Sequence, residues 1–395
     1  MQLIELAEYE SRRFPRNDLL NEDVELLWRK FRNQVSIETP SFKTDGQWEL
    51  TAGGWAGFIP LTERVGISLK PKVPLANLFG MMDWAYRLRG LKFPSGLFHS
   101  DSLSEFYDYL VSILAKRILD RGRKGYYRVY LGRRDLLPHL RGRWDVLSHL
   151  RNPARIHLAC EFEEHTPDIP ENQILYWTLS RVVRSGLCSE RTLPVARRAF
   201  RSLQGFAQLI HFTPADCAER LYNRLNLDYQ PLHVLCRFFL EHSGPSHKVR
   251  DKEMIPFLID MDGLYEKFVA EWLRPHLPPR FKLLVQDSYR TGEGDVIKWK
   301  VDLVLLDTLT GKPAVVMDTK YKRSQHPASD DIQQVVAYAE AKGCREAVLI
   351  YPSTDHQRID ERVGAIRVRS LVFSIADDLD KGGDKFLDEM LLSME

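Results

Sequence analysis

The chain has 395 residues, of which 44% are hydrophobic and 28% charged, and its formal net charge is +2. This length and apolar content are sufficient for two or three domains with cores of their own. The five cysteines are widely separated and form no closely spaced pair, which argues against a structural zinc or an iron–sulfur cluster. Charges occur too early for a signal peptide and no apolar run reaches membrane-spanning length, so we expect a cytoplasmic protein with no membrane partner.

The N-terminal part, residues 1–98, is predicted to be β-rich. Short strand-like runs at 36–42 and 66–73 alternate with turn signals such as the glycine pair at 53–54.

The middle part, residues 99–250, is predicted to be mainly helical, with helices over 102–121 and 170–185. The polar stretch 241–256 contains Gly and Pro and marks the expected start of a third domain, residues 251–395.

A basic patch lies in the middle part. Twelve Lys/Arg and three Asp occur between Lys116 and Arg155, with tyrosines and Trp144 among the arginines. Such a patch suits DNA phosphates or an acidic partner surface, and a solvated helix end and loop would look the same. The candidate contact residues are Arg123, Lys124, Arg133, Arg134, Arg141 and Arg143.

The most informative stretch is 296–322, which predicts two strands joined by a turn. Asp302 interrupts one apolar run, and Asp318 and Lys320 follow another. Because an unpaired buried carboxylate is costly, such acids are usually paired or bound to a metal.

A turn over 308–312 would pair Asp307 with Pro313 and place Asp302 directly opposite Asp318. Side chains so opposed lie roughly 5 Å apart at Cβ. Two facing carboxylates repel unless a cation lies between them, and carboxylate oxygens are ligands that Mg²⁺ prefers. The hairpin therefore predicts a divalent-metal site with Lys320 beside it.

Two helices flank this hairpin. The pattern at 261–273 predicts an amphipathic helix whose Glu266 leans toward the apolar side, although a solvated glutamate fits equally. A second helix over 329–343 begins at the N-cap candidate Ser329, ends at Gly343, and carries Gln334 and Tyr338 on one face. Further strands are predicted at 281–287, 346–351 and 366–373, which gives the order helix, strand, strand, strand, helix, strand.

This order and these residues resemble the PD-(D/E)xK nuclease superfamily. Asp302 matches its first acid, although Val precedes it in place of Pro, and Asp318-Thr319-Lys320 matches its acid-x-Lys step. Glu266 matches the helix acid ahead of the hairpin, and Gln334 with Tyr338 matches the QxxxY element of the RecB-like branch. The resemblance implies a multidomain α+β protein whose C-terminal domain has the αβββαβ core.

Segments 65–74, 140–146 and 159–177 also resemble the McrC family, the endonuclease subunit of McrBC-type modification-dependent restriction systems. The resemblance implies an antiviral defence protein whose N-terminal region docks on and stimulates a hexameric ring of the GTP-hydrolysing AAA+ partner McrB. Its C-terminal domain would cut double-stranded DNA. Since no Walker A pattern occurs, we expect no nucleotide site in this chain.

The expected chemistry is metal-assisted phosphodiester hydrolysis. Asp302, Asp318 and the main-chain carbonyl of Thr319 would hold Mg²⁺, with Mn²⁺ as a substitute, and Lys320 would orient the attacking water. Glu266 would complete the shell or position a second metal, while Gln334 and Tyr338 would brace the site. Two alternatives stay open: a non-catalytic adaptor that activates the AAA+ ring, and an autonomous RecB-like nuclease.

Overall fold

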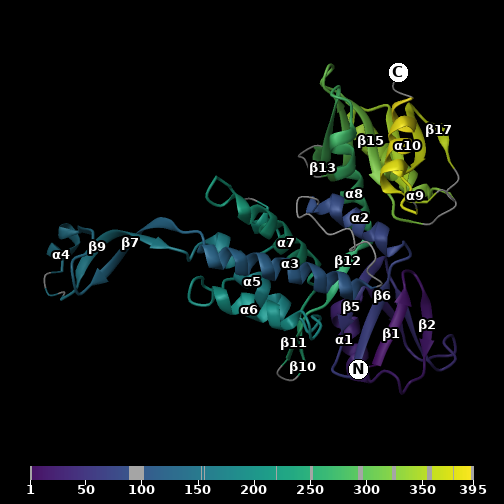
Figure 1. Ribbon diagram of the computed structural model, residues 1–395. Coiled ribbons are helices and arrows are strands. Elements are labelled where there is room, and N and C mark those ends of the chain that lie inside the picture. Colours follow the sequence, from purple (N-terminus) through teal and green to yellow (C-terminus); the bar gives the residue numbers. More distant parts are fainter. Residues whose placement is uncertain are drawn as a thin grey trace. The chain divides into compact units, whose positions relative to one another are not determined.

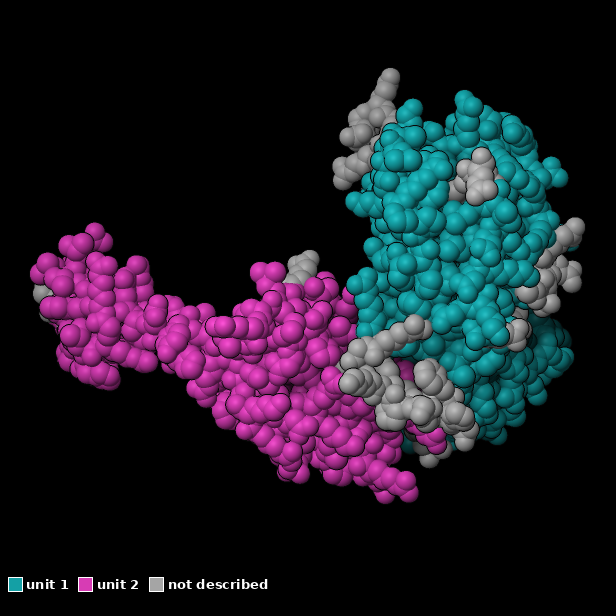
Figure 2. Space-filling view, turned by 45° about the horizontal axis from the view of Figure 1, so that its top comes forward, with its two compact units in different colours: residues 1–103, 256–395 teal, residues 104–255 magenta. Residues whose placement is uncertain are grey.

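The computed structural model of the protein describes residues 2–88, 102–152, 154, 156–218, 220–249, 252–291, 297–322, 326–353, 358–376 and 378–392. The chain forms two compact units, one of residues 1–103 and 256–395 and the other of residues 104–255 (Figure 2). The first unit contains an N-terminal and a C-terminal lobe.

The N-terminal lobe comprises residues 2–74 and one later strand, β12. A four-stranded sheet has the order β1-β6-β5-β12, and a three-stranded sheet has the order β2-β4-β3 (Figure 1). Leu27 and Phe31 of one helix are buried in the core that these sheets share. The elements are β1 (Gln2–Ala7), β2 (Ser11–Phe14), α1 (Asn21–Phe31), β3 (Val35–Glu38), β4 (Trp48–Ala52), β5 (Trp55–Pro60), β6 (Val65–Lys70) and β12 (Phe257–Asp260).

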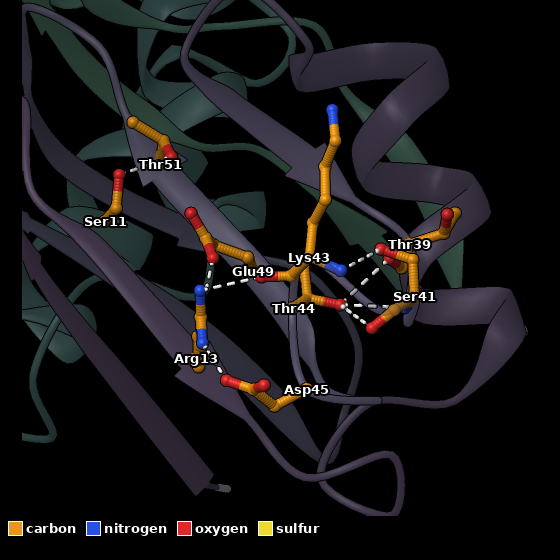
Figure 3. Close-up of polar contacts among 9 residues, drawn as sticks. All are labelled: Ser11, Arg13, Thr39, Ser41, Lys43, Thr44, Asp45, Glu49 and Thr51. Atoms are coloured by element: carbon orange, nitrogen blue, oxygen red, sulfur yellow. Dashed lines mark hydrogen bonds and ion pairs between the residues drawn. The ribbon is translucent and has the colours of Figure 1, made fainter.

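An arginine cross-links the small sheet of this lobe. The Arg13 guanidinium donates to Glu49 Oε2 at 2.8 Å and to the Lys43 carbonyl at 2.9 Å, and it also pairs with Asp45 (Figure 3). The beginning of β4 and the loop before it are thereby held against β2. All three acceptors are solvent-accessible, so we assign this cluster a local structural role.

The C-terminal lobe is built on a six-stranded mixed sheet of order β13-β14-β15-β16-β18-β17. Strands β15, β16 and β18 run parallel, and the remaining neighbours are antiparallel. The elements are α2 (Leu75–Tyr86), α8 (Met261–His276), β13 (Phe281–Thr291), β14 (Ile297–Asp307), β15 (Pro313–Thr319), α9 (Ser329–Lys342), β16 (Glu346–Tyr351), β17 (Asp360–Val363), β18 (Ile366–Val372) and α10 (Leu379–Leu391). The predicted order of helix, three strands, helix and strand is confirmed by α8, β13, β14, β15, α9 and β16.

Helix α9 ends as predicted but begins differently. Gly343 follows its last residue with φ +64°, a left-handed conformation that glycine adopts without strain. The N-cap, however, is Ala328 and not Ser329, and its side chain makes no capping hydrogen bond. Asp330 and Asp331 in the first turn instead place negative charge near the exposed N–H groups.

The hairpin between β14 and β15 contains a bulge. Leu306 pairs with Pro313, so the predicted partnership of Asp307 with Pro313 is wrong by one residue. The register shifts between Leu305 and Leu306, after which Leu303 pairs with Met317. Carried one residue further, this register places Asp302 opposite Asp318. Without the bulge every side chain of one strand would face the other side of the sheet.

The two lobes of the first unit are joined by continuous backbone and by hydrogen bonds. Strand β12 pairs with β5 of the N-terminal lobe and leads directly into α8, whose first amide, that of Met261, donates to the Gly54 carbonyl at 3.1 Å. Helix α2 follows β6 of the N-terminal lobe in the chain and is held within the C-terminal lobe, where Asn77 Nδ2 donates to the Ile375 carbonyl after β18 at 2.8 Å.

The second unit is a helical body with a β arm, and the arm projects from the body (Figure 1). The predicted mainly helical character holds for the body but is wrong for residues 129–166, which form the arm. We call residues 129–166 the β arm; its sheet has the order β7-β9-β8. The elements are α3 (Leu103–Lys124), β7 (Val129–Leu137), β8 (Arg143–Trp144), α4 (Val146–Leu150), β9 (Leu158–Thr166), α5 (Pro170–Arg184), α6 (Leu193–Leu203), the 3₁₀ turns Ala215–Cys217 and Leu227–Tyr229, α7 (Gln230–His242), β10 (His247–Val249) and β11 (Lys252–Met254).

Among the described residues, no helix is both long enough and apolar enough to cross a membrane.

Candidate functional site

Asp302, Asp318 and Lys320 meet where β14 and β15 leave their ladder. Lys320 Nζ lies 2.7 Å from Asp318 Oδ2, as expected for two residues on one face of a strand. Asp302 Oδ2 accepts hydrogen bonds from the Thr319 amide at 3.1 Å and from its hydroxyl at 3.2 Å. The hairpin therefore gathers two carboxylates and an ammonium.

The electrostatics of this cluster are unusual. Burial and the neighbouring charge of Asp302 raise the pKa of Asp318 to about 7, although Lys320 opposes the shift. Burial lowers the pKa of Lys320, but the contact with Asp318 and the charges of Asp331 and Asp302 together outweigh it, and the net direction is upward. Acids with a pKa shifted in this way concentrate at functional sites, because the fold there keeps a charged group in an environment that disfavours its charge.

Helix α9 positions the lysine. Gln334 Oε1 accepts from Lys320 Nζ at 2.9 Å, and Gln334 Nε2 donates to the Tyr338 hydroxyl at 2.7 Å. The Tyr338 ring packs edge-on against Trp299, with ring centroids 5.6 Å apart. The two residues predicted to share a helix face thus form a relay that ends on Lys320.

Sequence reasoning missed Asp331, which belongs to the same relay. It is 5% exposed, accepts from Lys322 Nζ at 3.0 Å and lies 3.8 Å from Lys320 Nζ. Its spacing of three residues before Gln334 was the available signal, because positions i and i+3 share a helix face.

Glu266 comes close to the site from α8. Burial, and next the charge of Asp302, raise the pKa of Glu266, and Gln286 Nε2 donates to its Oε1 at 3.2 Å. Gln286 has φ +51° in the middle of β13 and lies in register with Asp302 between the pairs Val285–Leu303 and Asp287–Val301. A left-handed glutamine inside a strand had no sequence signal, since Asn, Asp and Gly are the residues that favour this conformation.

Two further acids at the start of α8 were also missed. Burial raises the pKa of Asp260, and burial together with Asp260 raises the pKa of Asp262 to about 6. The charges of Lys320 and Lys322 act on Asp262 in the opposite direction, so this helix end is electrostatically linked to the site.

The donor set can be compared with the needs of a metal ion. Over the described residues, no three His, Cys, Asp or Glu side chains converge as ligands. Asp318 Oδ2 is buried and accepts no well-aligned hydrogen bond there, its ion pair with Lys320 apart. Two carboxylates and a main-chain carbonyl are hard oxygen donors, and Mg²⁺ commonly takes few protein ligands and keeps several waters. The residues fit that ion.

Three of the six candidate contact residues in the predicted basic patch form ion pairs with acids of the second unit. Arg133 and Arg134 on β7 meet Glu164 and Glu161 on β9 at 2.6 and 2.5 Å. The Arg141 guanidinium lies 4.1 Å from the centre of the Phe162 ring. The acids of β9 follow the predicted basic segment in sequence, so the patch is less positive than its sequence window implied.

Of the other three candidate contact residues, one is paired with an acid and two are exposed. Arg123 pairs with Asp120 one helical turn away at 2.8 Å, whereas Lys124 and Arg143 are exposed. Arg133, Arg134, Arg141 and Arg143 all lie on the β arm, and Arg134 and Arg143 both pair in register with Glu161 of β9.

The fold and the site define a multidomain α+β protein with an acidic, lysine-bearing site at the edge of a mixed sheet. The chain belongs to the family of McrBC 5-methylcytosine restriction system components, which matches residues 50–352. The resemblance to the McrC family predicted from the sequence is thereby confirmed.

Two known proteins are similar to the chain. The type IV methyl-directed restriction enzyme EcoKMcrBC of Escherichia coli (strain K12) is 23% identical over 214 residues, which are 53% of this chain and 61% of that protein. The chain thus spans less than two thirds of this curated relative. A chain of the half-complex of Thermococcus gammatolerans McrB AAA+ hexamers with bound McrC has 18% identity and a TM-score of 0.58, with 98% of this chain and all of that chain covered. This second likeness supports the fold.

Proposed function

We propose that the protein is the DNA-cutting subunit of a McrBC-like restriction complex, an endonuclease of the PD-(D/E)xK type that depends on Mg²⁺. The observation that carries the proposal is the convergence of Asp302, Asp318 and Lys320 at the bulged hairpin. A scaffold has no need for two facing carboxylates, one of them buried, whose repulsion weakens the fold.

Each residue has a role in phosphodiester hydrolysis. Asp302, Asp318 and the Thr319 carbonyl would hold the ion, with Mn²⁺ as a substitute. The bound ion supplies charge stabilisation at the phosphate and a lowered pKa for its water. Lys320 orients that water or offsets charge that develops on the phosphate.

The surrounding residues keep this arrangement in place. Gln334 fixes the position of the Lys320 ammonium, and Tyr338 fixes Gln334. Glu266 supplies a further carboxylate, held by Gln286. A pre-ordered site of this kind avoids reorganisation at the moment of reaction.

The second part of the proposal is a partner, a hexameric McrB-like AAA+ GTPase ring, which the β arm of the second unit contacts. Trp144, Leu147 and Leu150 near the tip of the arm are 40%, 70% and 67% exposed. Neighbouring exposed apolar side chains on a thin projection indicate a protein interface. The likeness in fold to a chain of the McrB–McrC half-complex supports the choice of partner.

The experiment that tests the nuclease assignment measures cleavage of double-stranded DNA with Mg²⁺, with and without the AAA+ partner and GTP. Asp302→Asn and Asp318→Asn should each lower the rate about 1000-fold or more. Asp384→Asn, an exposed acid on α10, is the matched control and should cut normally. Cutting that survives both substitutions contradicts the nuclease assignment.

The partner assignment has its own test. The double substitution Leu147→Ser/Leu150→Ser should abolish stimulation of the partner's GTPase, whereas Leu221→Ser, 91% exposed but outside the arm, should not. Stimulation without any DNA cutting would favour the non-catalytic adaptor, and cutting without the partner would favour the autonomous nuclease.

A further inference from the structure

A hollow of about 320 Å³ lies between the two lobes of the first unit. Its volume is at the lower end of the range for small-molecule sites. The lining residues follow directly or closely after the ends of β1, β6, β15, β16 and β18. Strands β1 and β6 are parallel to each other, as are β15, β16 and β18. Ligands of α/β sheets typically bind beyond the carboxyl ends of parallel strands, where backbone and loops converge.

The lining of the hollow contains two aromatic and three charged side chains. Tyr9 and Tyr321 both line it, and the Tyr321 hydroxyl donates to Glu8 Oε2 at 3.2 Å. Lys72 and Lys322 add two ammonium groups, and Lys72 Nζ lies 5.3 Å from the centre of the Tyr9 ring. Apart from Ser353, the remaining lining is apolar.

Tyr9, which lines the hollow, has a strained backbone conformation. Its φ is +58°, a conformation that is unusual for a bulky side chain. The hydroxyl lies against Gly54, where a side chain would collide with it. Strained residues of this kind collect at ligand sites, since the surrounding fold has to enforce them.

The hollow adjoins the acidic site. Tyr321 and Lys322 directly follow Lys320 in the chain, so they extend the same edge of the sheet. Lys322 donates to Asp331 at 3.0 Å, and Asp331 lies 3.8 Å from the Lys320 ammonium. If a phosphate of a DNA strand lies at Asp318 and Lys320, the neighbouring nucleotide of that DNA strand is therefore within reach of the hollow.

We propose that the hollow binds one unstacked nucleotide of the DNA strand next to the phosphate that is cut. The base lies against the tyrosine rings, its exocyclic amino group faces Glu8, and its phosphate meets Lys72. Bases that carry an amino group are preferred to thymine. This inference rests on the proposed function for its ligand, but its test does not require cleavage.

The test measures binding of the full chain to a fluorescein-labelled 12-nucleotide oligodeoxycytidylate in EDTA, by fluorescence anisotropy. Tyr9→Ala should weaken binding about tenfold, the usual effect of losing one base–aromatic stack. Trp28→Ala is the matched control and should change nothing, since Trp28 is an exposed aromatic of the same lobe, outside the hollow. Lys72→Ala should lower the slope of log affinity against log salt by about 0.7, the value for one phosphate contact on a single strand.

Two further binding measurements identify the ligand. Oligodeoxycytidylate should bind more tightly than oligothymidylate of the same length, and equal binding overturns the role of Glu8. Deoxycytidine monophosphate should compete weakly; competition as strong as that of the strand would mean that the hollow takes a free nucleotide, which overturns the proposal.

The two proposals fail separately. If Tyr9→Ala and Lys72→Ala, with unchanged thermal unfolding, both bind like the wild type while Asp318→Asn abolishes cutting, the nucleotide site is wrong and the nuclease stands. If binding depends on Tyr9 but no condition yields cutting, the nuclease is wrong and the nucleotide site stands.

Discussion

The ammonium of Lys320 lies 2.7 Å from the buried carboxylate of Asp318. Asp318 is only 2% exposed, and Asp302 adds a second negative charge on the other strand of the hairpin. Lys320 therefore supplies the positive charge that offsets a carboxylate which the fold holds away from water. Removing Lys320 would leave the buried Asp318 charge uncompensated, whereas neutralising Asp318 removes that charge itself, so substitutions here separate stability from activity.

The first prediction concerns Asp318→Asn. The substitution removes one of two repelling carboxylates and keeps the shape of the side chain, so in EDTA we expect a melting temperature equal to or above that of the wild type. Cleavage should be lost. Mg²⁺ should raise the melting temperature of the wild type alone, because binding to the folded state stabilises it. Equal Mg²⁺ shifts for both proteins would exclude Asp318 as a ligand.

The second prediction tests the relay from α9. Gln334→Ala removes the acceptor that helix α9 supplies to the Lys320 ammonium, although the ion pair with Asp318 remains. The cleavage rate should fall by about 10- to 100-fold, because a small displacement of a catalytic group is costly. Mg²⁺ binding should be unchanged. Gln333→Ala is the control, because Gln333 is the exposed neighbour on the same helix. If both variants cut equally well, Gln334 has no part in positioning.

The third prediction uses the strained backbone of Gln286. Glycine adopts φ +51° freely, so Gln286→Gly should stabilise the fold by about 1 kcal/mol in urea titrations. The same substitution removes the donor that holds Glu266 and should slow cleavage. Gln286→Ala keeps the strain and loses the donor, so it should be slow without a gain in stability. A Gly variant with full activity would mean that the strain has no function.

Much of the C-terminal lobe was predictable from its sequence, because apolar runs and helix periodicity are local signals. The pairing of Asp302 with Asp318 was predicted from a turn that is wrong by one residue, and the bulge beside Leu306 restores the register. A bulge depends on packing on both faces of the sheet, which local sequence does not record.

The β arm was missed for a similar reason. Its strand β7 is exposed over most of its length and lacks the apolar alternation that indicates a half-buried strand. Its pairing with β9 depends on partners such as Glu161 and Glu164, about 30 residues away. Gln286 likewise acts through a contact between elements, with Glu266, which no spacing within β13 reveals. Asp331 shares a helix face with Gln334, but its partners Lys320 and Lys322 lie outside that helix.

The fourth prediction concerns the pH dependence of the helical body in the second unit. His233 is fully buried in α7; the Tyr222 hydroxyl lies 2.8 Å from its Nδ1, and its Nε2 lies 3.0 Å from the Glu171 carbonyl oxygen. Burial is the main cause that lowers its pKa from 6.5 to about 4. The unfolded chain therefore binds a proton between these two pH values and the folded chain does not.

Stability from this residue is fully present above pH 6.5 and is lost as the pH falls toward 4, because protons then favour the unfolded state. The loss should amount to about 3 kcal/mol at most in urea titrations between these limits. His233→Gln should be less stable at pH 7, since it loses packing and hydrogen bonds, but its stability should change less over the same range. An equal pH dependence in both proteins would mean that His233 is not the group that titrates, and that the acid sensitivity of this unit comes from other groups.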